Sequence, residues 1–263
     1  MTIKSQVLPV ALVTTLLAAV FIPASKAMKQ PHDSSNPPAP ALSLTQPCDE
    51  DVDASTCPLS GCGELGDALL NQAKNRSDIA AHPVHMTLDQ IKKIEQPDRW
   101  DTGSSRTDIQ VANKEGTPVW TTGYLLKAKK EGAESCNCGL TGVTRTDVHL
   151  VIVSSMPDVD DEDEFADAER NSVTAELTPR VRAKGHPNWT YKNAQDLEGY
   201  YVRLNGWLML DSKHIPQAHK LPHERANKPL TRATSWEIHP VMNFQYCTKS
   251  KKACDHNVGW VNF

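Results

Sequence analysis

The sequence predicts a mainly β protein, namely a five-stranded OB-like barrel that follows a short N-terminal helical segment. Two observations carry this prediction. From about residue 107 onward, apolar and polar residues alternate with a period of two in successive segments, which is typical of strands with one buried face. A short helical pattern, NAQDLEG at residues 193–199, falls between the third and fourth segments, in the element order of an OB-fold, a small Greek-key barrel. An open β-sandwich is the main alternative.

The first 27 residues have the features of a signal peptide. Lys4 supplies a positive n-region, an uncharged apolar stretch follows, and residues 25–27 offer the small residues that a signal peptidase needs. Residues 28–47 are rich in Pro, Ser and Asn, which predicts a disordered linker. We therefore expect a secreted or periplasmic protein whose mature chain starts at Met28. An uncleaved membrane anchor is the alternative, although the apolar stretch is short for a span.

Residues 48–106 predict a cysteine-bearing helical segment before the barrel. Leu65, Leu69 and Leu70 fit one stripe of a first short helix. In a second, Thr87 and Gln90 have the spacing of a capping box, and Pro97 would end the helix. We expect the OB-like barrel domain to occupy residues 107–263.

The five barrel strands are predicted at residues 117–130, 147–155, 172–181, 200–211 and 232–244. Gly123 marks a bend or bulge in the first strand. His239-Pro240 marks the fifth as an edge strand or as a strand with a bend, because proline lacks a backbone donor. Period-two alternation predicts one shared core that includes Val148, Leu150, Ala175, Leu204, Leu208, Trp236 and Ile238.

Charge argues against general nucleic-acid binding. Removal of residues 1–27 leaves 26 Lys and Arg against 32 Asp and Glu, a formal charge of −6. Such a chain lacks the positive field that drives non-specific association with phosphates. The acids concentrate at residues 157–169, where we expect a solvated, self-repelling loop. Residues 212–232 hold three histidines and five basic residues, and predict the one local basic surface.

All seven cysteines lie beyond the signal peptide, and disulfides are their expected use in an oxidising compartment. Cys247 and Cys254 flank a polar turn and form the most natural local pair. Two of Cys48, Cys57 and Cys62 are expected to pair with each other. Cys136 and Cys138 are too close for an unstrained mutual disulfide, so we expect one of them to bond a distant partner. A copper or zinc site that uses these two thiolates and a nearby histidine is the alternative.

Charged residues recur on the predicted polar side of the strands. They are Asp147, His149, Glu176, Arg203, Glu237 and His239. Asp-x-His and Glu-x-His each place a carboxylate beside an imidazole on one face. We expect a structural role, with Glu237 and His239 in cross-strand hydrogen bonds and His239 near solvent. The alternatives are ligand contact and a metal site of two histidines and a carboxylate.

Several motifs together resemble an uncharacterised family of exported bacterial proteins. They are LLNQAKNR (69–76), GYLLKAKKEGAESCNCG (123–139), DVHLVIV (147–153), AELTPRVR (175–182), VRLNGWLMLDSKH (202–214) and TRATSWEIHPV (231–241). The ESCNC, VRxxGWLMxD and WEIHPV patterns are its signature. The resemblance implies a shared fold and export. It assigns no catalytic residue, because the family has no established activity.

The sequence therefore predicts an exported, non-enzymatic binding or scaffolding module of the cell envelope, with a polymer or protein partner and no cofactor. OB-type barrels bind ligands across the second and third strands and adjoining loops. The candidate ligand-binding residues are accordingly His149, Glu176, Arg203, His214, Arg232, Glu237 and His239. The alternative function is a metal-dependent hydrolase, phosphodiesterase-like, that uses His149, Glu237 and His239 with zinc or copper.

Overall fold

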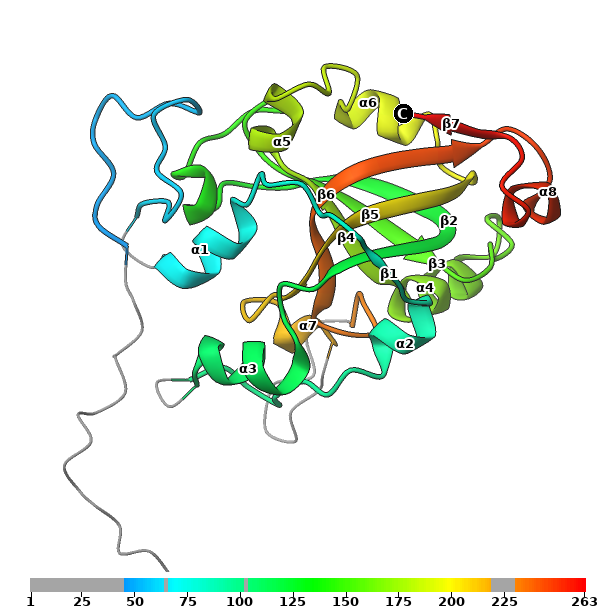
Figure 1. Cartoon of the computed structure of the whole chain (residues 1–263), viewed down its shortest axis with the longest axis horizontal. Coiled ribbons are helices and arrows are strands. Elements are labelled where there is room, and N and C mark those ends of the chain that lie inside the picture. Colours follow the sequence, from blue (N-terminus) through cyan, green and yellow to red (C-terminus); the bar gives the residue numbers. More distant parts are fainter. Residues whose placement is uncertain (1–44, 64–65, 102–103, 219–229) are drawn as a thin grey trace, which may run out of the picture. The chain divides into compact units, whose positions relative to one another are not determined.

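The computed structural model describes residues 45–63, 66–101, 104–218 and 230–263 (Figure 1). The expected signal peptide and nearly all of the expected linker lie outside these residues, as does most of the expected basic loop. The described residues belong to one compact unit, in which the cysteine-bearing segment packs with the barrel. Along the part of the chain that is described, no helix has the length and apolar character needed to cross a membrane.

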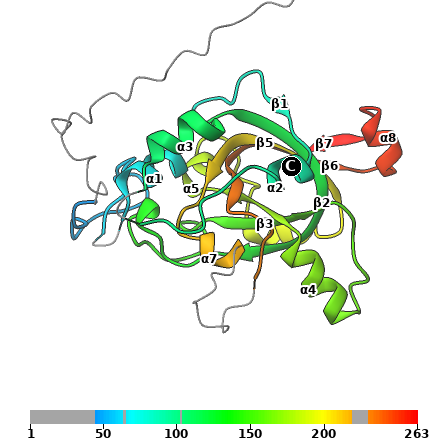
Figure 2. The ribbon, with the colours of Figure 1, turned by 90° about the horizontal axis from the view of Figure 1, so that it is seen from below.

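The predicted mainly β architecture with a closed five-stranded barrel is confirmed. The barrel strands are β2 (Pro118–Lys130), β3 (Val148–Val153), β4 (Val173–Leu177), β5 (Tyr201–Leu210) and β6 (Trp236–Cys247). They run in the order β2-β3-β4-β6-β5, and β5 pairs with β2 to close the ring. The β4–β6 pairing is parallel and the other barrel pairings are antiparallel. Figure 2 looks into this ring from one end.

Two short strands extend the sheet outside the ring. Strand β1 (Val84–His85) pairs in parallel with β2, and β7 (Trp260–Asn262) pairs antiparallel with β6. The strands β7, β6, β5, β2 and β1 are therefore consecutive neighbours on one side of the barrel (Figure 1).

The core fills the barrel as the alternation predicted. Val148, Leu150, Ala175, Leu204, Leu208, Trp236 and Ile238 are all buried in one cluster of apolar side chains. Leu88 and Ile91 of α2 (Leu88–Lys92) join this cluster, and the predicted capping box of Thr87 and Gln90 is present. Gly123 packs where a Cβ atom would lie 2.6 Å from Ile152 Cγ2, while the register shift of β2 falls nearby, between Leu125 and Lys127.

Eight helices and one 3-10 turn lie among the described residues. They are α1 (Ala68–Lys74), α2, α3 (Arg106–Asn113), η1 (Ser135–Asn137), α4 (Glu162–Arg170), α5 (Pro179–Ala183), α6 (Tyr191–Gln195), α7 (Ile215–Ala218) and α8 (Lys251–Asp255). The third strand ends at Leu177, earlier than predicted, because Thr178 caps α5 and Pro179 is its first residue.

Most of the acidic segment lies in helix α4 (Glu162–Arg170), so the prediction of a loop is wrong for residues 162–169. Asp161 caps α4 by accepting from the backbone N–H groups of Asp163 and Glu164, both at 3.0 Å. Acids in the first turn also complement the helix dipole. Phe165 and Ala168 then pack on an apolar patch of the barrel that contains Leu126, Val151 and Val153. Local capping and this patch outweigh the repulsion among the acids.

Three disulfides confirm the expected use of the cysteines. Cys247 pairs with Cys254, and Cys48 pairs with Cys62 within the N-terminal segment. The Cys57–Cys138 bond ties that segment to the connection between β2 and β3. Cys136 remains unpaired and buried.

Candidate functional site

Five of the predicted polar-side residues lie together on the outward side of β3, β4 and β6. They are Asp147, His149, Glu176, Glu237 and His239. Asp147 directly precedes β3, and His149 is opposite Glu176 in the β3–β4 ladder. The parallel β4–β6 pairing sets Ala175 opposite Ile238, which brings Glu176 beside the two residues of β6. Strand pairing alone therefore assembles two imidazoles and three carboxylates.

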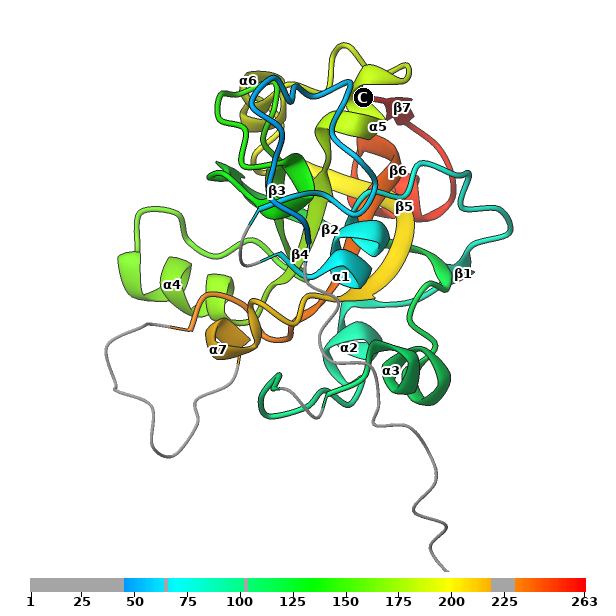
Figure 3. The ribbon, with the colours of Figure 1, turned by 90° about the vertical axis from the view of Figure 1, so that its left-hand side faces the viewer.

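This assembly is closed off from solvent. Glu176, Glu237 and His239 are 0% exposed, Asp147 is 1% exposed and His149 is 5% exposed. The prediction that His239 lies near solvent is wrong: β6 lies between β4 and β5 and is not an edge of the barrel. Helix α1, turn η1 and the segment after β5 cover this surface, and Figure 3 shows α1 in front of it. Pro240 instead accompanies a bend, since the β5–β6 register shifts between Gly206 and Leu208.

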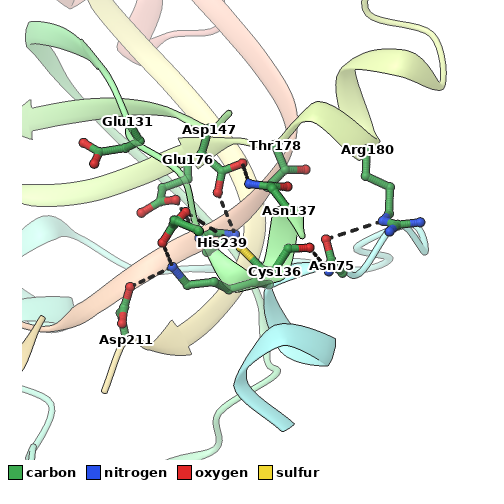
Figure 4. Close-up of polar contacts among 12 residues, drawn as sticks. Asn75, Glu131, Cys136, Asn137, Asp147, Glu176, Thr178, Arg180, Asp211 and His239 are labelled. Atoms are coloured by element: carbon green, nitrogen blue, oxygen red, sulfur yellow. Dashed lines mark hydrogen bonds and ion pairs between the residues drawn. The ribbon is translucent and has the colours of Figure 1, made fainter. Parts of the chain in front are cut away.

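The covering segments add their own polar side chains. Lys74 of α1 places its Nζ 2.9 Å from Glu134 Oε1 and 3.0 Å from Asp211 Oδ2. Cys136 of η1 lies in one group with Glu134 and Asp147, whose ligand atoms are within 4.8 Å of one another. We call the five strand residues together with Lys74, Glu134, Cys136 and Asp211 the buried polar cluster (Figure 4).

Glu176 stands between the two imidazoles. His149 Nε2 lies 2.5 Å from Glu176 Oε1, and His239 Nδ1 lies 3.0 Å from Glu176 Oε2. Burial opposes the charge of His149, but Glu176 and the hydrogen bond with Glu131 outweigh it and raise the pKa of His149 to about 10. Burial also opposes the charge of His239, but the Glu176 carboxylate outweighs burial and raises the pKa of His239 well above its usual value. The pKa of Glu176 is correspondingly lowered well below its usual value, against the effect of burial.

Asp147 has the opposite electrostatic environment. Burial, together with the nearby Glu134 and Glu176 carboxylates, raises the pKa of Asp147 well above its usual value. Its Oδ1 accepts a hydrogen bond of 3.1 Å from Asn137 Nδ2. Asp147 is therefore the carboxylate of the buried polar cluster that is least compensated by positive charge.

The remaining predicted ligand-binding residues divide into two groups. Arg232 Nη1 lies 3.0 Å from Glu237 Oε2, and His214 Nδ1 lies 2.7 Å from Asp211 Oδ2, so both contact the edge of the buried polar cluster. Arg203 lies elsewhere, on the outward side of β5. Glu176 lies between His149 and His239, so the predicted metal ligands His149, Glu237 and His239 do not form one group. Among the described residues, the groups whose ligand atoms lie within 4.8 Å of one another are other combinations.

Sequence reasoning missed Lys74, Glu134 and Asp211. The signal available for Lys74 was its place on α1, three residues after the buried Asn71 and four after Leu70. That spacing puts the amine on the buried stripe of the helix. Asp211 had a weaker signal, because it follows the last apolar residue of a strand.

A second, exposed surface lies on the outward side of the neighbouring strands β7, β6, β5 and β2. We call it the aromatic–amide face. It consists of Trp120, Thr122, Arg203, Asn205, Asn243, Gln245, Trp260 and Asn262. The ladders set Trp120 opposite Asn205, and Arg203 opposite both Thr122 and Gln245. Each of its side chains is half-buried or exposed.

The Arg203 guanidinium joins the two tryptophans of this face. Its carbon lies 4.3 Å from the ring centre of Trp260 and 5.4 Å from that of Trp120. His85 of β1 is opposite Trp120 in the β1–β2 ladder, with ring centres 4.1 Å apart and ring planes tilted by 33°. These contacts hold flat ring surfaces in fixed positions on a rigid sheet.

Comparison with models of protein families, with curated proteins and with solved structures finds no match. The functional proposals below therefore rest on the residues of this chain.

Proposed function

We propose that this protein is an exported, non-enzymatic binding module, built on an OB-fold barrel, whose ligand is a hydroxyl-rich polysaccharide of the cell envelope. The observation that carries the proposal is the aromatic–amide face, which extends over the four neighbouring strands β7, β6, β5 and β2. Export is supported by the signal-like N-terminus and by the three disulfides, which are typical of oxidising compartments.

The chemistry of the aromatic–amide face suits sugar rings. The flat face of an indole packs against the C–H groups on one side of a sugar ring, and it does so at little cost in side-chain entropy. Asn and Gln side chains both donate and accept hydrogen bonds, as hydroxyl groups do. Asn205, Asn243 and Gln245 lie among the tryptophans, so apolar and hydrogen-bonding contacts alternate along the sheet.

Charge favours a neutral polymer over a nucleic acid. Within the aromatic–amide face as described, Arg203 is the one charged side chain. Nucleic-acid binding draws most of its affinity from several cations that neutralise phosphates, and this face offers one. The expected mature charge of −6 acts in the same direction.

The surface that OB-fold proteins commonly use for ligands is occupied by the chain itself. That surface lies on the second and third barrel strands, here β3 and β4. Helix α4 covers part of it, and α1 with η1 covers the buried polar cluster. We therefore place the ligand on the opposite strands, where Arg203 alone of the predicted ligand-binding residues lies.

The alternative of a metal-dependent hydrolase is less well supported. A hydrolytic metal needs an open coordination position that water and substrate can reach. His149, Glu237 and His239 are at most 5% exposed, and Glu237 is engaged by Arg232. Burial thus favours the binding module.

Retention on immobilised polysaccharides tests the proposal. The probes are a panel of neutral and acidic polysaccharides, with single-stranded DNA as the polyanion. Trp120→Ala should weaken binding to a neutral polysaccharide by roughly tenfold, about 1.4 kcal/mol. Arg203→Gln should also weaken it, while the control Ile79→Ala, at an exposed residue outside the face, should not. Absence of binding to every polysaccharide, or unchanged binding by both face variants, would refute the proposal.

A further inference from the structure

Five buried atoms of the buried polar cluster lack a hydrogen-bond partner in the part of the chain that the structure describes. Three of them, His149 Nε2 and the two Glu176 oxygens, lie within 3.0 Å of an oppositely charged group, but the other two do not. They are Asp147 Oδ2 and His239 Nε2, and they lie 3.9 Å apart. This distance is too long for a hydrogen bond between them. Unpaired polar atoms at full burial are costly and rare, so a native protein usually provides a partner for each. A group that accepts a lone pair from both atoms would remove this cost.

The surroundings of His239 prepare its Nε2 atom as a ligand. Its Nδ1 lies 3.1 Å from Glu237 Oε1 and 3.0 Å from Glu176 Oε2. A proton on Nδ1 is thus donated to a carboxylate, which leaves the Nε2 lone pair directed at Asp147. Metal-binding histidines in proteins commonly have this carboxylate partner on the second ring nitrogen. Asp147 is oriented in turn by the hydrogen bond from Asn137 to its other oxygen.

Cys136 supplies a third potential ligand at the same place. It is the one cysteine of seven without a disulfide, and it is only 2% exposed. Its sulfur lies within 4.8 Å of carboxylate oxygens of Glu134 and Asp147. Asp147 in turn has an oxygen within 4.8 Å of ligand atoms of Glu176 and His239. Figure 4 shows the side chains of Cys136 and Asp147 converging on His239. The Cys136 thiol and the His239 imidazole therefore each lie near the Asp147 carboxylate.

Charge balance points in the same direction. Asp147, Glu176, Asp211 and Glu237 are fully buried carboxylates, but the permanent cations Lys74 and Arg232 pair with only two of them, Asp211 and Glu237. The missing positive charge can come from second protons on the histidines or from a divalent cation. A proton on His239 Nε2 would have no acceptor within hydrogen-bond distance in the described structure. A cation between Nε2 and Asp147 has both as ligands.

We propose that Cys136 Sγ, Asp147 Oδ2 and His239 Nε2 bind a zinc ion, with Glu134 as the fourth ligand. Mixed sulfur, nitrogen and oxygen ligands select zinc over calcium and magnesium, which take oxygen alone. Nitrogen and oxygen ligands of a tetrahedral zinc lie roughly 3.3 Å apart, so Asp147 and His239 need to approach by about half an ångström. Binding releases the thiol proton of Cys136 and any proton on His239 Nε2 or on the Asp147 carboxyl to solvent, and it leaves His239 with a single proton on Nδ1.

This zinc site is structural and distinct from the polysaccharide face. Its ligands come from η1, the residue before β3, and β6, so the ion joins the connection between β2 and β3 to the barrel sheet. A cavity of about 230 Å³ between α1, α3 and β5 includes His239 in its lining.

Elemental analysis of the full chain, exported and purified without chelator, tests the site. We expect about one zinc per chain. Asp147→Asn and Cys136→Ser should each lose the zinc. The matched control is His149→Gln, which alters a histidine of the same cluster that is not a ligand, and it should retain zinc. Circular dichroism and disulfide mapping establish that each variant is folded.

A second measurement keeps the proposal testable if the variants misfold. The wild-type chain is stripped with a chelator and then titrated with zinc or with cobalt. We expect zinc to raise the melting temperature, and cobalt to give the charge-transfer absorption of a thiolate ligand. Wild-type protein that contains no zinc as purified, and whose melting temperature zinc does not change after stripping, would overturn the proposal. Retention of zinc by folded Asp147→Asn and Cys136→Ser would overturn the ligand assignment.

Discussion

At the scale of single residues, the charge balance of the buried polar cluster depends on a buried lysine. Lys74 is 3% exposed and pairs with two carboxylates, one of which is fully buried. Burial opposes its charge, but Asp211 and Glu134 raise the pKa of Lys74 well above its usual value. The amine is therefore held charged in the interior, and its removal leaves those carboxylates uncompensated.

We predict that Lys74→Met destabilises the fold by about 3–5 kcal/mol, the usual cost of breaking a buried pair by removing one partner. The matched control is Lys251→Met, because Lys251 pairs with Asp255 at the surface, where both side chains are more than 40% exposed. That control should cost at most about 1 kcal/mol. Urea unfolding of both variants measures the difference. Equal destabilisation would contradict the view that burial sets the strength of the Lys74 pairs.

The residues that the sequence could not place are those whose partners are distant along the chain. The alternation of β3, β4 and β6 placed His149, Glu176 and His239 on the correct side of their strands, because that signal is local. It did not reveal that α1 and η1 cover this side. Lys74 precedes Asp211 by more than a hundred residues, and no local pattern records such a contact.

At the scale of elements, the strands were predictable because each carries its own period-two pattern. Leu204 illustrates the result, since it lies in the interior opposite Thr121 and Phe244 and is 0% exposed. We predict that Leu204→Ala costs roughly 2–5 kcal/mol, the transfer and cavity cost of truncating a buried leucine. Thermal or urea unfolding measures it. An unchanged melting temperature would mean that the strand register is wrong.

Helix α4 was missed because its formation depends on a cap and on an apolar patch of the barrel. Asp161 is the cap, and it accepts two backbone hydrogen bonds. We predict that Asp161→Ala destabilises the helix by about 0.5–2 kcal/mol. Hydrogen exchange should then speed up in α4 and remain unchanged in β3. The control is Asp163→Ala, which removes an acid within the same helix without removing the cap. If both variants behave alike, charge and not capping governs the helix.

At the scale of the whole molecule, the disulfides join parts that differ greatly in separation along the chain. Cys57 and Cys138 are 81 residues apart, and their bond fastens the covering N-terminal segment beside Cys136. Cys247 and Cys254 are only 7 residues apart and fasten a local turn. The sequence predicted the local pair directly. It indicated only that Cys136 or Cys138 has a distant partner, since the spacing of cysteines does not encode the fold that brings them together.

Loop-closure entropy predicts which of these two disulfides stabilises the fold more. A cross-link restricts the unfolded chain more when it closes a longer loop, and the two separations imply a difference of about 2 kcal/mol. We predict that the Cys57→Ser, Cys138→Ser double variant is less stable than the Cys247→Ser, Cys254→Ser double variant by roughly that amount. The first should also expose Cys136 to thiol reagents, because η1 loses its attachment, whereas the second should leave Cys136 protected. Urea unfolding and the rate of Cys136 alkylation measure the two effects. Equal stability with Cys136 protected in both variants would show that the N-terminal segment covers the cluster without help from the disulfide.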